Sequence, residues 1–326
     1  MTDRSRTVDP EPVGPTAPSP TGSSVDAAQV EASDEAGAAA LGTVLRTLDL
    51  DAGDAPDTFV GTSLAHPNGR VFGGQVLAQA LLAAGRTLVD DPDAGPRLPH
   101  SLHGYFLRAG EIDVPIEFGV ERLRDGRSFS ARRTHAAQHG APILSMTASF
   151  QQEQPGIDYA ERMPHGAPGP EEAPTALDHL ARIDHPFARF WADGAFDVRH
   201  VNGSIYLRPD RERTGRQLAW VKARAAVPDD QLLHRALLAY ACDQVMLEPV
   251  LRHAGLSWAT PQLSIASLDH AMWWHRDVHV DEWLLYVQSS PSGQGGRGLG
   301  AARVFDQDGA LVASIAQEGM VRVPLG

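Results

Sequence analysis

Apolar residues occupy nearly every face of the stretch Gln231–Leu251, QLLHRALLAYACDQVMLEPVL, which contains no glycine or proline before Pro249. The preceding VPDD supplies a turn and an N-cap. A helix that is apolar all round is one that a protein buries completely, so the pattern predicts a buried helix here. Asp243 lies in the middle of it. A buried carboxylate is costly unless it is hydrogen-bonded by local backbone donors or used in function, and both interpretations stay open on this stretch alone.

A second helix is predicted over Phe72–Ala84, an Ala- and Leu-rich segment in which Gly73 and Gly74 come first. Paired glycines allow close backbone approach, and the first N–H groups of a helix have no partner inside it. The segment therefore indicates either close packing of the helix on a sheet or an oxyanion or phosphate site. Upstream, the pattern predicts a short amphipathic helix over Glu35–Leu50 and a first strand over Asp57–Ser63.

Downstream of each long helix, the pattern takes the period of strands. Residues 101–152 are predicted to form four strands, separated by Arg-Ala-Gly, Arg-Asp-Gly and Gln-His-Gly turns. Residues 196–205 and 216–226 are predicted strands that precede the buried helix, and residues 262–323 form a second series of strands after it. Each helix is thus followed by an antiparallel meander.

The two meanders resemble each other in sequence. GRSFSARRTHAAQHGAPILSMTAS aligns with GRGLGAARVFDQ-DGALVASIAQE, with Gly126-Arg127 against Gly296-Arg297 and Gly140-Ala141 against Gly309-Ala310. Upstream, HGYF-LR at His103 matches HAMWWHR at His270 with a one-residue slip, which indicates a structural hydrogen bond shared by both copies. The chain is therefore predicted to be a tandem duplication of a strand–helix–meander unit.

This duplication defines the predicted organisation. Residues 1–34 are rich in Pro, Ser, Thr, Gly and acidic residues, and we expect a disordered acidic, Pro-rich tail. Residues 35–153 form the N-terminal unit and residues 196–326 the C-terminal unit. Residues 154–195 are a linker, Pro- and Gly-rich at first, with a short helical segment over residues 176–187.

Composition excludes several classes of partner. The chain has 326 residues, of which 42% are hydrophobic and 21% charged, and a formal charge of −13. An acidic protein is a poor ligand for nucleic acid, and no apolar run is long enough to span a bilayer. The N-terminus has no apolar stretch typical of an export signal. The single cysteine, Cys242, lies in the buried helix, so we predict a cytoplasmic protein with neither nucleic acid nor membrane as a partner.

One basic cluster stands out against this acidic background. It is the place where an anionic ligand would be met, although for most of its members the solvated face of a hairpin is the alternative. Its members are Arg122, Arg124, Arg127, Arg132 and Arg133.

A long helix wrapped by a curved antiparallel sheet is the hotdog arrangement, and two copies in one chain would share a continuous sheet around both helices. Eight motifs, in order, resemble the acyl-CoA thioesterase II (TesB-like) family over nearly all of the chain from about residue 40 onwards. They are VFGGQVLAQAL, HSLHGYFLRAG, LRDGRSFSARR, MTASFQ, VPDD, LDHAMWWHR, DEWLLY and DGALVASIAQEG. The resemblance implies an α+β fold, a double hotdog.

The resemblance also implies an activity, the hydrolysis of fatty acyl-CoA to free fatty acid and CoA without a metal or organic cofactor. The family's catalytic Asp, Thr or Ser, and Gln match Asp243, Ser267 and Gln317. Many relatives carry Thr where this chain has Ser267, so we expect looser geometry and unchanged chemistry. Ala148 stands in the first copy where Gln317 stands in the second, which implies one active site per chain.

Four residues at the start of the first helix are predicted to bind substrate: Phe72, Gly73, Gly74 and Gln75. Within this group, the Gly73-Gly74 turn is the candidate for the N–H groups that stabilise the oxyanion. Edges of hotdog helices and sheets pair with another subunit, so we expect a homo-oligomer.

The sequence disfavours three alternative functions. A serine hydrolase of the α/β class is disfavoured, because no G-x-S-x-G occurs and strands do not alternate with helices. A hotdog hydratase or dehydratase would need a histidine beside Asp243, and the repeat places none there. A non-catalytic acyl-CoA-binding regulator would use the same tunnel, but it has no reason to keep Asp243, Ser267 and Gln317 together.

Overall fold

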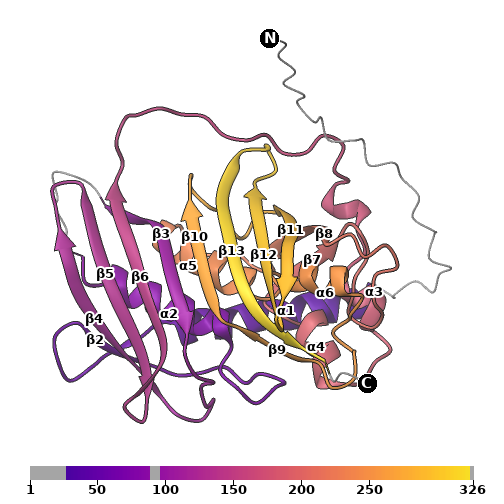
Figure 1. Ribbon diagram of the computed structural model, residues 1–326, viewed down its shortest axis with the longest axis horizontal. Helices are drawn as coiled ribbons and strands as arrows, with labels where there is room; N and C mark the ends of the chain where they lie inside the picture. The colour runs from indigo at the N-terminus through magenta and orange to yellow at the C-terminus, as the bar shows by residue number, and fades with distance from the viewer. Residues whose placement is uncertain (1–26, 89–95, 324–326) are drawn as a thin grey trace.

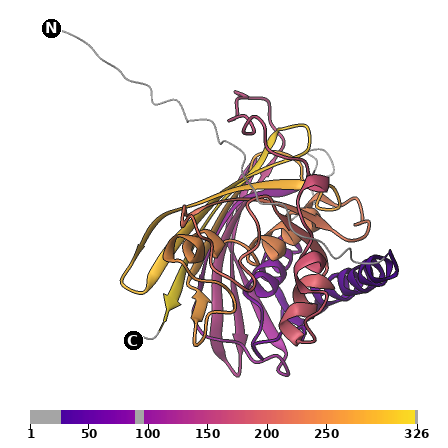
Figure 2. The ribbon, with the colours of Figure 1, turned by 90° about the vertical axis from the view of Figure 1, so that its right-hand side faces the viewer.

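Helices α2 (Gly73–Gly85) and α5 (Gln231–Cys242) pack against each other beneath one continuous sheet (Figure 1). The structure is a computed structural model that describes residues 27–88 and 96–323. In the side view the sheet curves, and the helices lie on its concave side (Figure 2). None of the helices in these two described ranges is long and apolar enough to cross a membrane.

The strands are antiparallel to their neighbours, and within the described residues they form a 13-stranded sheet. The first half of the chain contributes β1 (Asp51–Ala52), β2 (Thr58–Gly61), β3 (Arg97–Phe106), β4 (Ile116–Asp125), β5 (Phe129–Gln138) and β6 (Ala141–Gln152). The second half contributes β7 (Phe196–His200), β8 (Arg216–Ala223), β9 (Ser264–Ser267), β10 (Asp269–Trp274), β11 (Leu284–Gln294), β12 (Arg297–Phe305) and β13 (Leu311–Arg322).

The strand order shows the duplication directly. From the centre outwards, the first half runs β3-β6-β5-β4-β2 and the second half runs β10-β13-β12-β11-β8. The two halves meet where β3 pairs with β10, so the sheet continues from one unit into the other (Figure 1). The predicted α+β double hotdog is confirmed.

The predicted match of His103 with His270 is wrong at the level of side chains. His103 pairs with Ala271 on the outer face, where it is exposed and its ring lies 5.2 Å from that of Trp273. His270 pairs with Gly104 and is buried on the inner face. A slip of one residue moves a strand's side chains to the opposite face of the sheet, so the two histidines are not structural equivalents.

The inner faces give the correct match. Leu102 lies opposite Ala148 in the β3–β6 pair. In the β10–β13 pair, Ala271 lies opposite Ala316, which places the neighbouring His270 beside Gln317. Since Ala148 corresponds to Gln317, Leu102 corresponds to His270. The first unit therefore holds a leucine and an alanine where the second holds a histidine and a glutamine.

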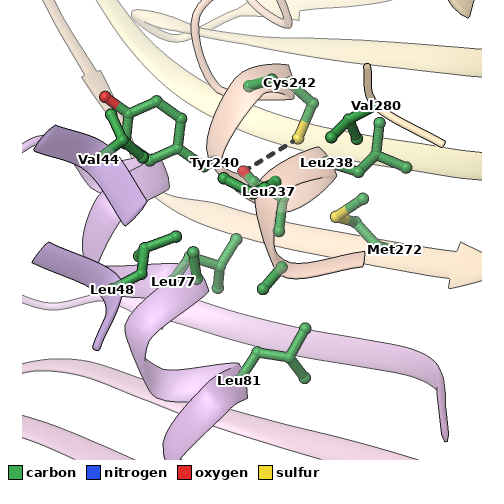
Figure 3. Close-up of a cluster of buried hydrophobic side chains, with 14 of the residues drawn as sticks. Val44, Leu48, Leu77, Leu81, Leu237, Leu238, Tyr240, Cys242, Met272 and Val280 are labelled. Carbon is green, nitrogen blue, oxygen red and sulfur yellow. Dashed lines mark hydrogen bonds between the residues drawn. The ribbon is translucent and has the colours of Figure 1, made fainter. Parts of the chain in front are cut away.

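The core lies between the helices and the concave face of the sheet. Leu77 and Leu81 of α2 and Leu237 and Leu238 of α5 belong to one buried cluster, which also receives side chains from the helix α1 and from β10 (Figure 3). All four leucines are fully buried, and the side chains from α1 (Ala27–Leu48) are those of Leu41, Val44 and Leu48. Burying such side chains contributes roughly 1.5–3 kcal/mol each, which explains why α5 is apolar on every face.

The predicted helix over Gln231–Leu251 is interrupted. It ends at Cys242, and a second helix, α6, covers Glu248–Ala254 after a turn over residues 243–247. Pro249 is compatible with this break, because it lies in the first turn of α6, where its missing N–H costs nothing, whereas inside one continuous helix its ring would clash with the carbonyl of Val245. Asp243 is therefore the first residue after α5 and does not lie inside a helix.

Two further predictions need correction. Helix α1 covers Ala27–Leu48, so the part of the predicted tail over residues 27–34 is helical; residues 1–26 lie outside the described residues. This start of α1 is held by Ser33, whose hydroxyl donates to the carbonyl of Ala192 at 2.8 Å. The linker's predicted helix is two helices, α3 (Ala176–Leu180) and α4 (Pro186–Ala192), after a 3-10 turn at Pro170–Glu172.

A buried polar network fixes the turn that carries Asp243. The Glu248 carboxylate accepts hydrogen bonds from His200 at 2.6 Å, from Gln217 at 2.6 Å and from the indole N–H of Trp258 at 2.8 Å. Arg252 also donates to the Gln217 carbonyl. Gln288 belongs to the same network, and its side-chain amide donates to the backbone carbonyl of Val245 in the turn at 3.0 Å. A buried charge is tolerated when it is paired in this way.

The pKa of Glu248 gives a test of this network. Burial favours its protonated form, but His200, Arg252 and Trp258 outweigh burial and hold the pKa below the ordinary 4.5. A lowered folded-state pKa adds stability above the unfolded-state value, and that stability is lost as the pH falls through the folded-state value. We expect Glu248→Gln to lower the free energy of unfolding by about 3 kcal/mol at pH 7, measured by denaturant titration.

The control is Glu282→Gln, which changes an exposed carboxylate of the same half. The difference between wild type and Glu248→Gln should shrink as the pH is lowered from 4.5 downwards, whereas Glu282→Gln should follow wild type. A difference that stayed constant over this range would show that the charge of Glu248 contributes nothing.

Candidate active site

The three predicted catalytic residues meet in a closed triangle of hydrogen bonds. Oδ1 of Asp243 accepts from the Ser267 hydroxyl at 2.9 Å and from the Gln317 amide at 2.7 Å. The Gln317 amide also donates to the Ser267 hydroxyl at 2.7 Å. The structure thus brings together side chains that lie far apart in the sequence.

Three elements of the second unit position this triangle. Asp243 follows the last residue of α5, Ser267 ends β9 and Gln317 lies within β13. Among the strands that the structure describes, β9 pairs with the end of β13, and Ser267 lies opposite Gly319, two residues beyond Gln317. Gln317 is fully buried on the inner face, while Asp243 and Ser267 are partly exposed. Asp243 and Ser267 are thus less buried than Gln317, whose amide supports them from inside.

The second oxygen of Asp243 binds the other unit. Oδ2 accepts the backbone N–H of Gly74 at 2.8 Å. The N-cap residue of α2 is Phe72, which has no side chain able to accept a hydrogen bond from the helix start, so Asp243 caps α2 across the boundary between units. The positive end of α2 favours the carboxylate and the negative end of α5 opposes it by a similar amount. The direct hydrogen bonds therefore decide where the carboxylate lies.

Both glycines at the start of α2 are required by this close approach. A Cβ at Gly73 would lie 2.7 Å from Oδ2 of Asp243, and a Cβ at Gly74 would collide with the backbone carbonyl of Tyr240. The predicted close packing of the glycines is correct, but their partner is α5 and its carboxylate, not a sheet. The N–H of Gly74 is used by Asp243, which leaves that of Gly73 as the helix-start donor beside the site.

The other two predicted substrate-binding residues differ in their surroundings. Phe72 is partly buried, with its ring 5.2 Å from that of Tyr240 and 5.6 Å from that of His66. Gln75 is fully buried, and its amide donates to the carbonyl of Thr62 at 3.1 Å and accepts the N–H of Leu64 at 2.9 Å. Through these contacts Gln75 fixes the loop that contains Thr62 and Leu64, which precedes α2.

Behind the triangle, Gln317 is held by residues that sequence reasoning did not place there. The carbonyl of its amide lies 2.8 Å from Nδ1 of His270, and Nε2 of His270 lies 3.3 Å from the Cys242 sulfur. Burial lowers the pKa of His270 and raises that of the Cys242 thiol, so both are neutral. The expectation that no histidine lies near Asp243 is therefore wrong, because His270 is one side chain away.

The basic cluster is largely neutralised by neighbouring acids. Arg122 binds Asp57 through two hydrogen bonds of 2.7 and 2.8 Å. Arg132 is fully buried and binds Asp125 at 2.7 Å, and Arg133 lies 3.4 Å from Glu121. Arg122 and Arg133 lie on the solvated face of the hairpin, as the alternative interpretation had it, whereas Arg132 is buried.

A second group of titratable side chains lies at the start of α5. Possible metal-ligand atoms of His234, His279 and Asp281 lie within 4.8 Å of one another. Nδ1 of His234 accepts the N–H of Val280 at 3.2 Å, so in the neutral ring the proton is on Nε2. A metal at Nε2 would force that proton onto Nδ1, against the N–H of Val280. Asp281 in turn accepts the N–H of Val227 at 3.0 Å. These contacts fasten the loop before β11 to α5.

Comparison with known proteins agrees with this architecture. A family profile described as "Acyl-CoA thioesterase" matches residues 202–320, and one described as "Acyl-CoA thioesterase N-terminal domain" matches residues 62–151. The two profiles cover the second and first units respectively.

Related proteins match along most of their length. Acyl-coenzyme A thioesterase 8 of Homo sapiens is 37% identical over 295 residues, covering 86% of this chain and 88% of the relative. Acyl-CoA thioesterase 2 of Haemophilus influenzae is 36% identical over 260 residues, covering 78% of this chain and 88% of the relative. The crystal structure of the acyl-CoA thioesterase II TesB2 from Mycobacterium marinum is 40% identical, with a TM-score of 0.70, and covers 86% of this chain and 98% of that one.

Fold and relatives together define a thioester hydrolase built as a double hotdog. The chain belongs to the acyl-CoA thioesterase family.

The close approach of α2 to α5 predicts that Gly74→Ala is destabilising. Alanine is normally the better helix residue, but here its methyl group would meet the Tyr240 carbonyl, and backbone cannot give way as a flexible side chain can. Overpacking of this kind costs about 1–3 kcal/mol. We expect a lower melting temperature by calorimetry. Gly119→Ala is the control, since a Cβ there meets nothing within 4 Å; a Gly74→Ala variant as stable as Gly119→Ala would contradict the packing argument.

Proposed function

We propose that the protein hydrolyses fatty acyl-CoA to free fatty acid and CoA, with Asp243, Ser267 and Gln317 activating a water molecule. The observation that carries the proposal is the carboxylate held by one hydroxyl, one amide and one backbone N–H, at 2.7–2.9 Å, in a residue that is only partly buried. The names of the relatives supply the substrate class, acyl-CoA.

The hydrogen bonds indicate which part of Asp243 acts. A carboxylate has about four acceptor positions. Two on Oδ1 are taken by Ser267 and Gln317, and one on Oδ2 is taken by Gly74. The remaining position on Oδ2 is the one that accepts a proton from water. General-base assistance of this kind is worth roughly a hundred- to ten-thousandfold in rate.

The thioester carbonyl needs a donor as its oxygen becomes negative. Gly74 is committed to Asp243, so the donor we assign is the N–H of Gly73, the first residue of α2 and next to Oδ2. N–H groups at a helix start stabilise such an oxyanion without reorganising during the reaction. The oxyanion donor that the sequence predicts in the Gly73-Gly74 turn is therefore assigned to Gly73 alone.

Bond making and breaking then balance without a further cofactor. The water oxygen bonds to the carbonyl carbon while Asp243 takes one of its protons. The tetrahedral intermediate collapses, the carbon–sulfur bond breaks, and the proton passes to the departing thiolate. A thiol with a pKa of about 8.5 leaves without a strong acid behind it, so the site needs a base and an oxyanion donor.

The neighbouring histidine does not favour the hydratase alternative. Such an enzyme requires a histidine that reaches the substrate. His270 is buried, and each of its ring nitrogens lies within hydrogen-bonding distance of a protein atom, one in Gln317 and one in Cys242. It therefore acts on the site through Gln317 only.

The compartment and the oligomeric state of the enzyme are also part of the proposal. We place it in the cytoplasm, because its single cysteine, Cys242, is a buried free thiol. We propose a homo-oligomer, since the continuous sheet still ends in two edge strands, β1 and β7, whose backbone groups can pair with another copy.

Loss of the base tests the proposal. We expect Asp243→Asn, and separately Gln317→Ala, to lower kcat by at least about a hundredfold, because the first removes the proton acceptor and the second its support. The measurement is the release of free thiol from palmitoyl-CoA, followed with a thiol reagent.

Asp229→Asn, at the exposed opposite end of α5, is the matched control and should keep full activity. Melting temperatures show whether each variant is folded. Folded Asp243→Asn with wild-type kcat would falsify the site assignment, and tight palmitoyl-CoA binding without thiol release in the wild type would instead favour the regulator.

The hydroxyl of Ser267 is the third part of the site that can be tested. Ser267→Ala removes a donor to Oδ1 of Asp243, and we expect kcat to fall roughly tenfold or more, as a charge-assisted hydrogen bond is lost. Ser267→Thr keeps the hydroxyl and should match or exceed wild type. Equal rates for the alanine and threonine variants in the thiol-release assay would show that the hydroxyl is not used.

A further inference from the structure

A buried chain of hydrogen-bond partners runs behind the candidate site and returns to its starting helix. It begins at Cys242, the last residue of α5, and passes through His270 on β10 to Gln317 on β13. From Gln317 it reaches Asp243, the residue that follows Cys242. The ring of contacts ties one helix end to two adjacent strands, and each of its members other than Asp243 is buried.

Hydrogen bonding decides which end of the Gln317 amide faces the site. The two ends of a carboxamide have nearly the same shape, so only their partners distinguish them. Asp243 and Ser267 require the NH2 group to face them. Nδ1 of His270 lies 2.8 Å from the other end, and a proton on this nitrogen requires the carbonyl there.

The surroundings of His270 favour that proton position. The ring is neutral, because burial lowers its pKa, and it therefore carries one proton. Its Nε2 faces the Cys242 sulfur at 3.3 Å. Burial raises the pKa of Cys242, so the thiol keeps its single proton, which it can donate either to Nε2 or to the carbonyl of Ala239. Nδ1 carries the ring proton, because its partner, the carbonyl oxygen of Gln317, can only accept. With the thiol donating to Nε2, every donor in the chain points toward Asp243.

The contribution of His270 becomes decisive during the reaction itself. While Asp243 is charged, its own attraction holds the NH2 group of Gln317. Once Asp243 has taken a proton from water, that attraction falls. The hydrogen bond from His270 then keeps the Gln317 side-chain amide from rotating and exchanging its two ends before the next cycle.

The two units of the chain support the same assignment. Ala148 replaces Gln317 in the first unit, and Leu102 occupies the place of His270. Both are fully buried. Where the amide is absent the imidazole is absent too, so the histidine is not a general requirement of this strand pairing.

We propose that His270 is a positioning residue, whose Nδ1–H fixes the Gln317 amide with its NH2 group toward Asp243 and Ser267. This rests on the function proposed above. It goes beyond that function by adding a residue that never touches the substrate and yet sets the turnover rate.

The test compares two variants that preserve different nitrogens. His270→Asn places an amide donor near the position of Nδ1, and His270→Gln places one near that of Nε2. We expect His270→Asn to keep kcat for palmitoyl-CoA within about threefold of wild type. His270→Gln should lose roughly ten- to a hundredfold, the range seen when a partner that orients a functional side chain is removed. KM should change little in both, because neither position reaches the substrate.

A double-mutant cycle shows whether the effect passes through Gln317. In a Gln317→Ala background, His270→Gln should change the residual kcat by less than about twofold. His270→Leu introduces the residue that the first unit has at the corresponding position, and a folded His270→Leu variant should have the same kcat as His270→Gln. An unchanged loss in the Gln317→Ala background, or equal rates for the Asn and Gln variants at equal melting temperatures, overturns the proposal.

The outcomes separate this inference from the function beneath it. If wild type releases no thiol from palmitoyl-CoA, or Gln317→Ala is fully active, the proposed function fails. If wild type is active and Gln317→Ala is impaired while His270→Gln keeps wild-type kcat, the positioning role alone is wrong.

Discussion

One carboxylate joins the two halves of this chain. Asp243 receives side-chain donors from two strands of the second unit through Oδ1 and a backbone donor from the first unit through Oδ2. Asp243 is only partly exposed, so each of these donors offsets part of the cost of placing a charge there. The glycine pair at the start of α2, the end of α5 at Cys242 and the pairing of β9 with β13 together allow this arrangement.

In this arrangement α5 ends at Cys242, earlier than the apolar pattern predicts. Asp243 is the C-cap of α5 and keeps a helical backbone conformation, and a turn over residues 243–247 separates α5 from α6. The turn that results exposes backbone groups inside the protein, and the network around Glu248 satisfies one of them at Val245. Buried polar groups at some distance from the site thus determine where the acid lies.

Sequence patterns predicted the strands, both long helices and the duplication, because these depend on periodicity and on repeated turns. They also brought Asp243, Ser267 and Gln317 together, through resemblance to a family. They misplaced His270, because an alignment shifted by one residue reverses which face of a strand a side chain occupies. They also could not show that Gly74 binds Asp243, since that contact joins residues of different units whose approach is set by packing.

The bond between Asp243 and Gly74 also restricts how such a chain could have arisen or could be split. Made alone, the first unit would have an uncapped α2, and the second would keep Asp243, Ser267 and Gln317 but lose the donor to Oδ2. The two units are therefore not interchangeable modules. His270 and Gln317 lie in the second unit, and the corresponding residues of the first, Leu102 and Ala148, are apolar and fully buried.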